Sequence, residues 1–499
     1  MSGRRIDDET TGVRPLGPGV RETHISWVFL TPDRAYKLLK PVCMPFLDLR
    51  TSDARISAVD RELELNRRVA PDVYLGVSDV REDGELIDRM LVMRRLPDER
   101  RLSALVDDDD FGSHLRAIAK AIAVLHADAP AVNPAPTATR DAIGALWADT
   151  LATIGDHVDA VIPRLEFERV AALARTYLQG REPLFAARIT EGMIRDGHGD
   201  LLAEDIFCLD DGPRIIDCLA FNDDFRIGDV LLDIGFLVMD VERLAGRDAG
   251  RRLLSWYDEF SGELHPATLA HHYVSYRALV RAKVACLRHA QGDEPSAELA
   301  RRYHAMALDH LERARVRIVL VGGGPGAGKS VLARGLADHH RATVLASDEI
   351  RKDLTGTPHD KHRFAAPGEG IYDDATTERA YQELLREAEL LLASGESVVL
   401  DATWTDRRHR VAARALAARA CAELTELECV LEPSIAKERI AGRLANPWNP
   451  SDATPDLVDH IAQRHDPWPE ATPIDTAPPV DEVIAAAQRI VARSAVPHA

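Results

Sequence analysis

The residues best suited to chemistry lie in one glycine-rich stretch, residues 323–330, with the sequence GGPGAGKS. The stretch fits G-x-x-x-x-G-K-[ST], the pattern of the phosphate-binding loop (P-loop). Glycines let backbone N–H groups close around phosphate oxygens, and the N-terminus of a following helix adds a partial positive charge. In that pattern Lys329 reaches the β- and γ-phosphates, and Ser330 is a ligand of Mg²⁺. The residues predicted to bind a nucleoside triphosphate are Gly323, Gly324, Gly326, Ala327, Gly328, Lys329 and Ser330.

The surroundings of this stretch support the interpretation. The apolar run Val316–Val321 precedes it and is typical of a buried parallel strand, and residues 331–340 show a helical pattern. Strand, glycine loop and helix in that order form the context in which the pattern binds phosphate. The alternative is an ordinary glycine turn with a surface lysine.

A second set of candidate residues lies upstream, in an acidic segment. Phosphoryl transfer needs a carboxylate that holds the acceptor hydroxyl, and oxygen ligands that hold Mg²⁺ between the phosphates. Asp200 fits the first role, and Asp205 and Asp217 fit the second. The alternative is a structural role for His198, Asp200 and Asp217.

The elements that must position this acidic segment follow from periodicity. Strand patterns are expected at residues 24–30, 34–40, 74–80 and 85–94, with a helix at 53–69. They make a small strand-rich lobe at about 20–95. Helical patterns follow at about 112–127, 140–157, 161–179 and 181–195, then short strands at 205–209 and 214–218, then further helices to about 315. The result is an α+β, protein-kinase-like domain over residues 1–315, with a helical lobe at about 96–315.

Residues 316–499 predict a second domain of a different class. Strands expected at 316–321, 342–346 and 397–400 alternate with helices, which is typical of an α/β fold with a parallel sheet. Polar residues follow two of these strands, where a parallel sheet faces its ligand crevice. They are Asp348 and Arg351 after the second strand and Asp401 after the third. A helix N-cap at Asp348 with a surface Arg351 is the alternative.

Composition narrows the classes of function. The chain is 45% hydrophobic and 29% charged, with a net charge of −19. From Val316 onward it carries 21 basic and 28 acidic residues, so both parts are acidic and a general nucleic-acid partner is disfavoured. No apolar run reaches the ~18 residues that span a membrane. The six cysteines form no C-x-x-C pair, which predicts a buried, reduced set and a cytoplasmic protein.

The segment HGDLLAEDIFCLDDGPRIIDCLAF, which begins at His198, resembles the catalytic loop and metal strand of aminoglycoside phosphotransferases and related small-molecule kinases. The resemblance covers about residues 20–290. It implies that Lys37 binds the α- and β-phosphates of ATP, that Glu62 is its ion-pair partner, and that Met93 lies at the adenine hinge. It also implies a place for His126 behind the catalytic loop and structural roles for Asp229 and Asp233.

Two features depart from that family. An asparagine usually stands where this chain has Asp205, so an added negative charge near the phosphates is expected to weaken ATP binding or change the metal preference. No G-x-G-x-x-G loop precedes Lys37, so the cover over the phosphates must be short or come from Thr23, His24 and Ser26.

The C-terminal domain resembles zeta-toxin-like and gluconate-kinase-like P-loop kinases over about 316–495. Asp348 with Arg351 is similar to the D-x-x-R of phage polynucleotide kinases, where the aspartate takes the acceptor proton and the arginine aligns the acceptor. Asp401 resembles the strand-end aspartate that orders the Mg²⁺ shell. Arg439 and Arg443 look like the arginines of a closing lid. A solvated helix face is the alternative for these two, and the arginines at 407, 408 and 410 are expected at the surface.

The whole chain therefore resembles actinobacterial bifunctional proteins that join an aminoglycoside phosphotransferase-like domain to an ATP-binding P-loop domain. The leading hypothesis is an ATP-dependent phosphotransferase with two Mg–ATP sites, acting on a hydroxyl of a sugar, aminoglycoside or nucleoside-like molecule. One alternative is a regulatory ATP-binding protein with an active P-loop domain and a weakened kinase-like domain. The other is a nucleic-acid end kinase, which the acidic balance disfavours.

Overall fold

The computed structural model of the chain describes residues 14–17, 19–44, 47–356, 358, 373–444 and 455–493. Contacts divide the chain into two compact units. The first comprises residues 1–143, 187–264 and 273–303, and the second comprises 144–186, 265–272 and 304–499. The second unit thus contains helices from the segment upstream of residue 315, where the sequence predicts a domain boundary. Among the described residues, no helix is long and apolar enough to cross a membrane.

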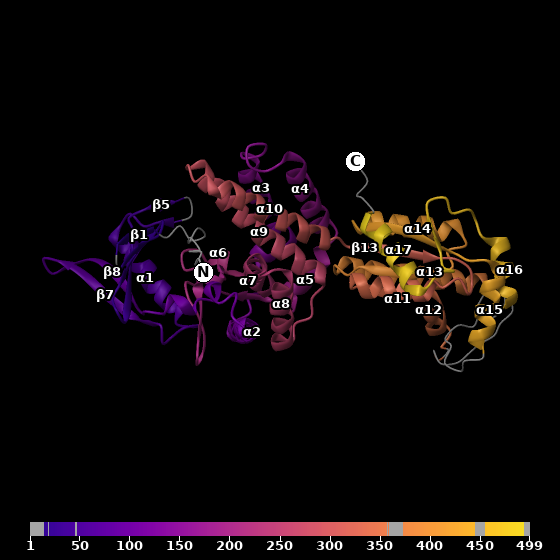
Figure 1. The fold of residues 1–499 in the computed structure, drawn as a ribbon, viewed down its shortest axis with the longest axis horizontal. Helices are drawn as coiled ribbons and strands as arrows, with labels where there is room; N and C mark the ends of the chain where they lie inside the picture. The colour runs from indigo at the N-terminus through magenta and orange to yellow at the C-terminus, as the bar shows by residue number, and fades with distance from the viewer. Residues whose placement is uncertain are drawn as a thin grey trace, which may run out of the picture. The chain divides into compact units, whose positions relative to one another are not determined.

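The N-terminal part of the first unit is a six-stranded antiparallel sheet with one helix packed on it (Figure 1). The sheet order is β1-β2-β3-β4-β8-β7. The elements are Arg14–Gly17 (β1), Val20–Glu22 (β2), Ser26–Leu30 (β3), Arg34–Leu39 (β4), Ser52–Asn66 (α1), Tyr74–Glu82 (β7) and Glu85–Arg94 (β8), and a minor hairpin joins Cys43–Met44 (β5) to Leu47–Asp48 (β6). Val59 and Leu65 of α1 bury against Tyr74 and Leu91 of the sheet, and each such side chain stabilises the fold by roughly 1.5–3 kcal/mol.

Most strands of this lobe match the sequence expectation, but the hairpin of β1 and β2 was not predicted. Its two strands have four and three residues, which is too short for an alternating pattern to stand out. Gly19 makes the turn at φ +91°, a conformation that side chains with a Cβ rarely adopt.

The rest of the first unit is mainly helical. Its elements are Phe111–Asp128 (α2), Ile194–Asp196 (β9), Ala203–Asp205 (η4), Ile206–Leu209 (β10), Gly212–Ile215 (β11), Asp223–Arg226 (α6), Ile227–Asp229 (β12), Val230–Ala245 (α7) and Arg247–Ser261 (α8). Helices Ala267–Ala290 (α9) and Pro295–Arg313 (α10) contribute residues to both units. The helix expected at 181–195 is too long, because α5 (Glu182–Thr190) ends at Thr190 and β9 then pairs with β12.

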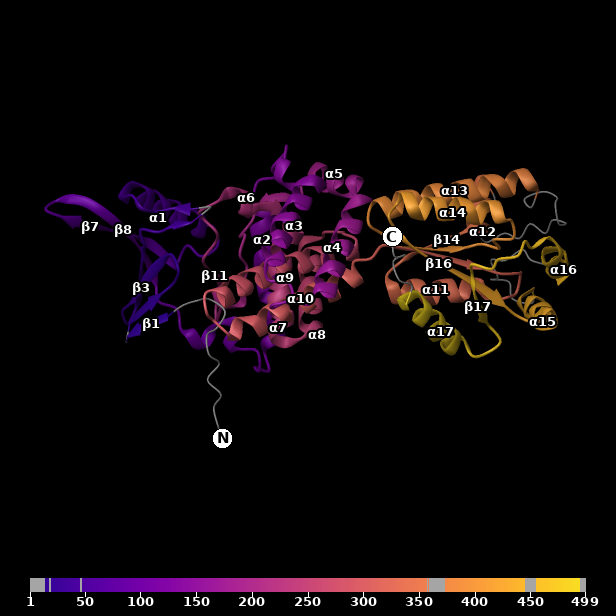
Figure 2. The ribbon, with the colours of Figure 1, turned by 90° about the horizontal axis from the view of Figure 1, so that it is seen from above.

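The second unit contains a five-stranded parallel sheet in the order β14-β15-β13-β16-β17. Its strands are Arg317–Gly322 (β13), Thr343–Ala346 (β14), Val398–Asp401 (β15), Glu423–Val430 (β16) and Thr472–Asp475 (β17). Its helices are Arg140–Gly155 (α3), from residue 144 on, Arg164–Gln179 (α4), Lys329–His340 (α11), Ser347–Leu354 (α12), Asp374–Ala393 (α13), Arg407–Arg419 (α14), Pro433–Leu444 (α15), Pro455–Arg464 (α16) and Val480–Arg493 (α17). Figure 2 shows α13 and α14 on one face of the sheet and α11 with α17 on the other. The predicted fold class is confirmed for both parts of the chain.

Buried polar contacts explain why helices from before residue 315 belong to the second unit. The fully buried Arg181 guanidinium donates to the Ala420 carbonyl at 2.7 Å. The Thr268 hydroxyl donates to the Gly395 carbonyl at 2.6 Å. The proposed boundary at 315 therefore remains a prediction about independent folding, and these contacts are what a cut there would remove.

The cysteines only partly match expectation. All six are free, and Cys208, Cys218, Cys286 and Cys429 are buried. Cys43 is exposed, however, because it lies in the short β5 strand rather than in the core.

Candidate functional site

The glycine loop of the second unit has the backbone shape of a phosphate cradle. It leaves β13 at Gly322 and enters α11 at Lys329, and Gly323, Gly326 and Gly328 all have positive φ angles. A Cβ on Gly326 would lie 2.6 Å from the Ala436 carbonyl, so the close approach to α15 requires glycine at this position.

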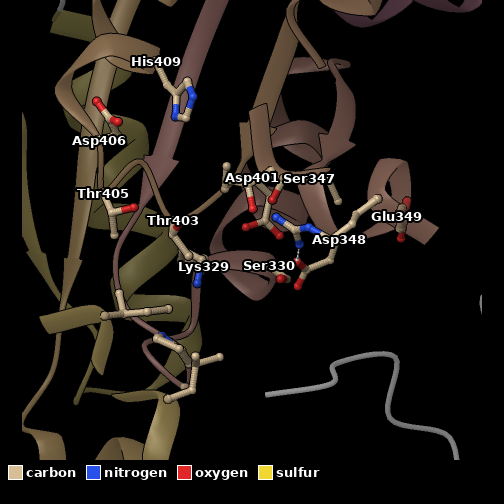
Figure 3. Close-up of a pocket in the computed structure, with 18 of the residues that line it drawn as sticks. Lys329, Ser330, Ser347, Asp348, Glu349, Asp401, Thr403, Thr405, Asp406 and His409 are labelled. Atoms are coloured by element: carbon tan, nitrogen blue, oxygen red, sulfur yellow. Dashed lines mark hydrogen bonds and ion pairs between the residues drawn. The ribbon is translucent and has the colours of Figure 1, made fainter. Parts of the chain in front are cut away.

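The loop opens into a cavity of about 760 Å³ at the carboxyl edge of the sheet. Register explains why side chains meet there: Val321 of β13 and Ala346 of β14 both pair with Asp401 at the end of β15. Figure 3 shows Lys329, Ser330, Asp401 and Asp348 converging on this space, whereas Glu349 points away. Lys329 Nζ itself donates to the Gly324 carbonyl at 3.0 Å.

Asp401 is buried, and opposing effects act on the pKa of its carboxyl group. Burial raises the pKa of its carboxyl group, while the ammonium of Lys329 and a hydrogen bond from Ser330 act in the opposite direction. A carboxylate and a hydroxyl side by side are hard oxygen donors that suit Mg²⁺. Together with the loop's backbone N–H groups they fit a magnesium-bound triphosphate.

Asp348 and Arg351 form an ion pair at the edge of the same cavity. Arg351 Nη1 donates to Asp348 Oδ1 at 2.6 Å within one turn of α12. The alternative of an N-cap at Asp348 with a surface Arg351 is wrong on both counts. The N-cap residue is Ala346, and Arg351 is only 6% exposed. The buried Arg351 thus holds the half-exposed carboxylate of Asp348 in place at the cavity.

The predicted lid arginines have different outcomes. Arg439 of α15 donates to the Thr476 carbonyl at 2.9 Å, and a Cβ on the P-loop residue Gly328 would lie 3.8 Å from its Nη1. It therefore belongs next to the loop and not on a solvated face. Arg443 is in the last turn of α15, and its side chain lies outside the described residues, as do residues 446–450.

The expectation that the arginines at 407, 408 and 410 lie at the surface is wrong for Arg410. It is 1% exposed, donates to the Asp466 and Pro467 carbonyls, and stacks over the Trp468 ring. Long-range packing against a segment 56 residues away buries it, which sequence periodicity cannot reveal. Arg407 and Arg408 are exposed, and Arg408 pairs with Asp406 beside the cavity.

The far wall of the cavity contains residues that sequence reasoning missed. His409 stacks on Tyr381 with ring centroids 3.8 Å apart, and its Nε2 lies 3.1 Å from Glu378 Oε2. The Tyr381 hydroxyl in turn accepts from the Trp404 N–H and contacts the Thr403 hydroxyl. Only the position of Thr403 after Asp401 was visible as a signal. Glu378 and Tyr381 come from α13 and His409 comes from α14, so their meeting depends on the fold.

In the first unit, Lys37 of β4 lies between two carboxylates. Its Nζ is 2.8 Å from Glu62 Oε1 on α1 and 2.9 Å from Asp217 Oδ1. Burial alone would lower the pKa of Lys37, but Asp217 and Glu62 raise it well above its ordinary value. Lys37 chiefly holds the pKa of Asp217 below the usual range. Glu62 is thus the ion-pair partner of Lys37, as the resemblance implies.

Asp217 is held by residues that the sequence did not single out. It follows β11 by two residues and has a left-handed backbone, with φ +64°. Its N–H donates to the Tyr74 hydroxyl at 2.9 Å, and the next N–H, of Cys218, donates to Asn66 Oδ1 at 2.8 Å. These two bonds fix a strained conformation that turns the carboxylate toward Lys37. In the sequence, the only signal for this support of Asp217 was the position of Asn66 one helical turn after Glu62.

The three aspartates of the acidic segment lie close enough to influence one another. Burial raises the pKa of Asp205 well above its usual range, and the charges of Asp217 and Asp200 add to the effect. Burial also raises the pKa of Asp200, although Arg281 opposes this. Asp200 and Asp205, with raised pKa values, lie near the Asp217 carboxylate, whose pKa is lowered by Lys37, and such a cluster of carboxyl groups fits a site for a cation.

The loop that carries Asp200 is anchored from behind by Asp233. Its carboxylate accepts from the N–H groups of His198 and Gly199 at 2.7 and 2.8 Å, and lies 3.0 Å from His126 Nε2. His126 therefore sits behind the loop, as the resemblance implies. Asp229 has a separate structural role, because it accepts two hydrogen bonds from the buried Arg188.

The remaining predicted residues lie on the sheet. Met93 is near the end of β8, paired with Ala35 and Tyr74, and is partly buried against the core. Thr23 and His24 lie in the turn between β2 and β3. Ser26 is fully buried and its hydroxyl contacts that of Thr23 at 2.8 Å, so it braces the turn from inside.

Comparisons with known proteins cover both parts of the chain. A family model described as "AAA domain" matches residues 318–468. The protein "Uncharacterized protein Rv2004c" of Mycobacterium tuberculosis is 40% identical over 480 residues, which cover 94% of this chain and 95% of the relative. A protein of Mycobacterium bovis, "Uncharacterized protein Mb2027c", matches with the same identity and coverage.

Two solved structures show weaker likeness. A choline/ethanolamine kinase family protein from Mesorhizobium loti is 19% identical, covering 61% of this chain and 94% of its own, with a TM-score of 0.38. A gluconokinase from Sinorhizobium meliloti is 19% identical, covering 36% and 92%, with a TM-score of 0.27. Scores this low assign neither a substrate nor the role of any residue.

Proposed function

Because the chain belongs to the same family as Rv2004c of Mycobacterium tuberculosis, we propose one activity for the whole length that they share: ATP-dependent transfer of a phosphoryl group to a hydroxyl of a small molecule. One observation carries the proposal. Lys329, Ser330 and Asp401 share a cavity with the Asp348–Arg351 pair, so groups suited to a triphosphate and groups suited to an acceptor face the same space.

The residues of this cavity divide the work of a transfer. The loop N–H groups and Lys329 would hold the β- and γ-phosphates, and Arg439 would balance charge near Gly328. Asp348, oriented by Arg351, would accept the proton of the acceptor hydroxyl. The acceptor oxygen then forms a bond to the γ-phosphorus as the bond to the β–γ bridging oxygen breaks. Mg²⁺, held by Ser330 and Asp401, would supply positive charge between the phosphates.

The first unit supports a second, similar site. Lys37, held by Glu62, would bind the α- and β-phosphates, and Asp200 would hold the acceptor hydroxyl. Asp205 and Asp217 would hold Mg²⁺. The P-loop with Gly326 belongs to the second unit, and Asp217 with its left-handed backbone belongs to the first. Each site can therefore be tested by substitutions in its own unit.

A regulatory role for the first unit is the second candidate, and one observation favours it. Asp205 adds a buried carboxyl group next to Asp217 and Asp200, and burial together with these neighbouring charges raises its pKa and disfavours its ionised form. Such a site would bind Mg–ATP weakly, and the P-loop site would then carry the turnover.

The test uses the full chain, so that both sites keep their surroundings. ATP consumption and phosphorylated product would be measured by mass spectrometry against sugars, aminoglycosides and nucleosides. Wild type, Lys329→Ala, Asp200→Asn and the double variant would be compared. Product that disappears in only one single variant assigns the activity to that site. If no acceptor is phosphorylated and neither site binds ATP, the proposed activity is wrong.

A further inference from the structure

The second unit contains another cavity, of about 710 Å³, away from the P-loop. It lies at the amino edge of the parallel sheet, where Arg317 begins β13 and Ser397 precedes β15, and where α11 ends at His340. The P-loop is at the opposite, carboxyl edge of the same strands. The charged and imidazole side chains that line this cavity, called here the basic cavity, are Arg169, His271, Asp309, Glu312, Arg313, Arg315, Arg317, His339, His340, Arg341 and Glu396.

Positive charge exceeds negative charge in the basic cavity, with five arginines against three carboxyl groups. Two of those carboxylates are already engaged. Glu312 pairs with Arg169 at 2.7 Å and with Arg315 at 3.0 Å, and Asp309 pairs with Arg313 at 2.7 Å. Within the described part of the chain, no carboxylate pairs with Arg341, and the buried His340 Nε2 has no hydrogen-bond partner.

The pKa values of Arg317 and His340 reflect the excess of positive charge in the basic cavity. Burial, followed by the charge of Arg315, lowers the pKa of Arg317 to about 10. Burial also lowers the pKa of His340 to about 4, with Arg317 contributing. Elsewhere in the chain, arginines such as Arg414 have raised pKa values because carboxylates surround them. Glu423 pairs with Arg315 and, at 3.5 Å, with Arg317. Among the described residues, Arg341 is therefore the arginine of the basic cavity that has no carboxylate partner, and its charge is available to an anion.

We propose that the basic cavity binds a small-molecule polyanion with two or more phosphate groups. Arginine presents a planar fork of N–H donors that matches phosphate oxygens, and several arginines around one space favour more than one phosphate. The volume lies in the range of small-ligand pockets. This ligand is separate from the ATP of the P-loop, because the two cavities share no lining residue.

Pyrophosphate binding to the full chain tests the proposal. Titration calorimetry would be done in a Lys329→Ala background, which removes the main phosphate contact of the P-loop. The test variant is Arg341→Gln, and the matched control is Arg419→Gln on α14. Both positions are exposed and each change removes one positive charge, but Arg419 pairs with Glu389 outside the cavity. Thermal unfolding of each variant checks that it folds.

We expect Arg341→Gln to weaken pyrophosphate binding about tenfold or more, as for loss of one charge-assisted contact, and Arg419→Gln to leave it unchanged. Citrate, a polyanion without phosphorus, should bind at least about tenfold more weakly than pyrophosphate. Equal affinity in the two arginine variants would overturn the proposal, as would loss of all pyrophosphate binding on Lys329→Ala alone. Citrate that binds as tightly as pyrophosphate would overturn the assignment to phosphate.

Discussion

Lys37 Nζ and Asp217 Oδ1 lie 2.9 Å apart, although 180 residues separate them in the chain. The lysine that is expected to bind phosphates thus already pairs with the carboxylate that is expected to bind metal. The Tyr74 hydroxyl and the Asn66 amide hold the backbone on either side of this contact. A nucleotide with its metal would have to take over part of this ion pair, so the charge of the neighbouring aspartates decides how readily it binds.

Asp205→Asn should preserve or raise the Mg–ATP affinity of the first unit. Asparagine keeps a carbonyl oxygen at the same reach and removes one of several crowded carboxylates. Two like charges a few ångströms apart cost about 1–4 kcal/mol at effective dielectrics between water and protein surface. The measurement is Mg–ATP titration of the full chain in a Lys329→Ala background.

Asp217→Ala is the comparison for that titration and should lose binding. If Asp205→Asn loses Mg–ATP binding as completely as Asp217→Ala does, the negative charge of Asp205 is essential for binding. If neither substitution changes the affinity, Mg–ATP does not bind through this loop, and the regulatory candidate is favoured.

Lys329→Ala should remove tight ATP binding from the P-loop. The loss of one charge-assisted contact to phosphate should cost roughly 1.5–3 kcal/mol. Calorimetry on the full chain measures it, with Asp217→Ala present to silence the first unit. Lys437→Ala serves as the control, because this lysine pairs with Asp459 and does not line the cavity. Unchanged affinity in Lys329→Ala would refute the phosphate-loop assignment.

Stability should fall as the pH drops from 7 toward 5, and His272 should contribute. Burial lowers the pKa of His272 to about 3, and its ring stacks on Tyr177 with centroids 4.4 Å apart. The unfolded chain takes up a proton below about pH 6.5, whereas the folded chain does not until about pH 3. The unfolded state therefore binds more protons in this window, and stability is lost as the pH falls.

His272→Phe tests this contribution by urea denaturation at several pH values. The variant should flatten the dependence by up to about 1.4 kcal/mol per pH unit below pH 6.5. Between pH 7.5 and 8.5 the difference between variant and wild type should be constant, which provides the internal control. An unchanged slope below pH 6.5 would contradict the assignment.

A fragment of residues 316–499 should fold, because its sheet and the helices on both faces lie within it. It should melt at a lower temperature than the corresponding part of the full chain. The cut removes the hydrogen bond from Arg181 to Ala420 and the ion pair between Arg315 and Glu423. Circular dichroism and thermal unfolding measure both expectations. A molten fragment would show that residues 144–186 are an integral part of this fold.

Local pattern in the sequence was sufficient for the P-loop and most of the elements around it. A strand, a loop of glycines and a helix are consecutive in the chain, so their chemistry depends on neighbours that the sequence displays directly. Strands β4, β7 and β8 and helix α1 were predictable for the same reason, since their residues alternate or repeat with the period of the element. The resemblance to known kinases supplied the pairing of Lys37 with Glu62.

Tertiary structure alone decided which distant residues meet. Tyr74 holds Asp217 across 143 residues, and Arg410 is buried by a segment near Asp466. The basic cavity joins Arg169 of α4 to the arginines at 313, 315 and 317. The positive φ of Asp217 likewise depends on these long-range bonds. Burial and charge compensation are properties of a three-dimensional neighbourhood, whereas a sequence pattern reports only the next few turns of the chain.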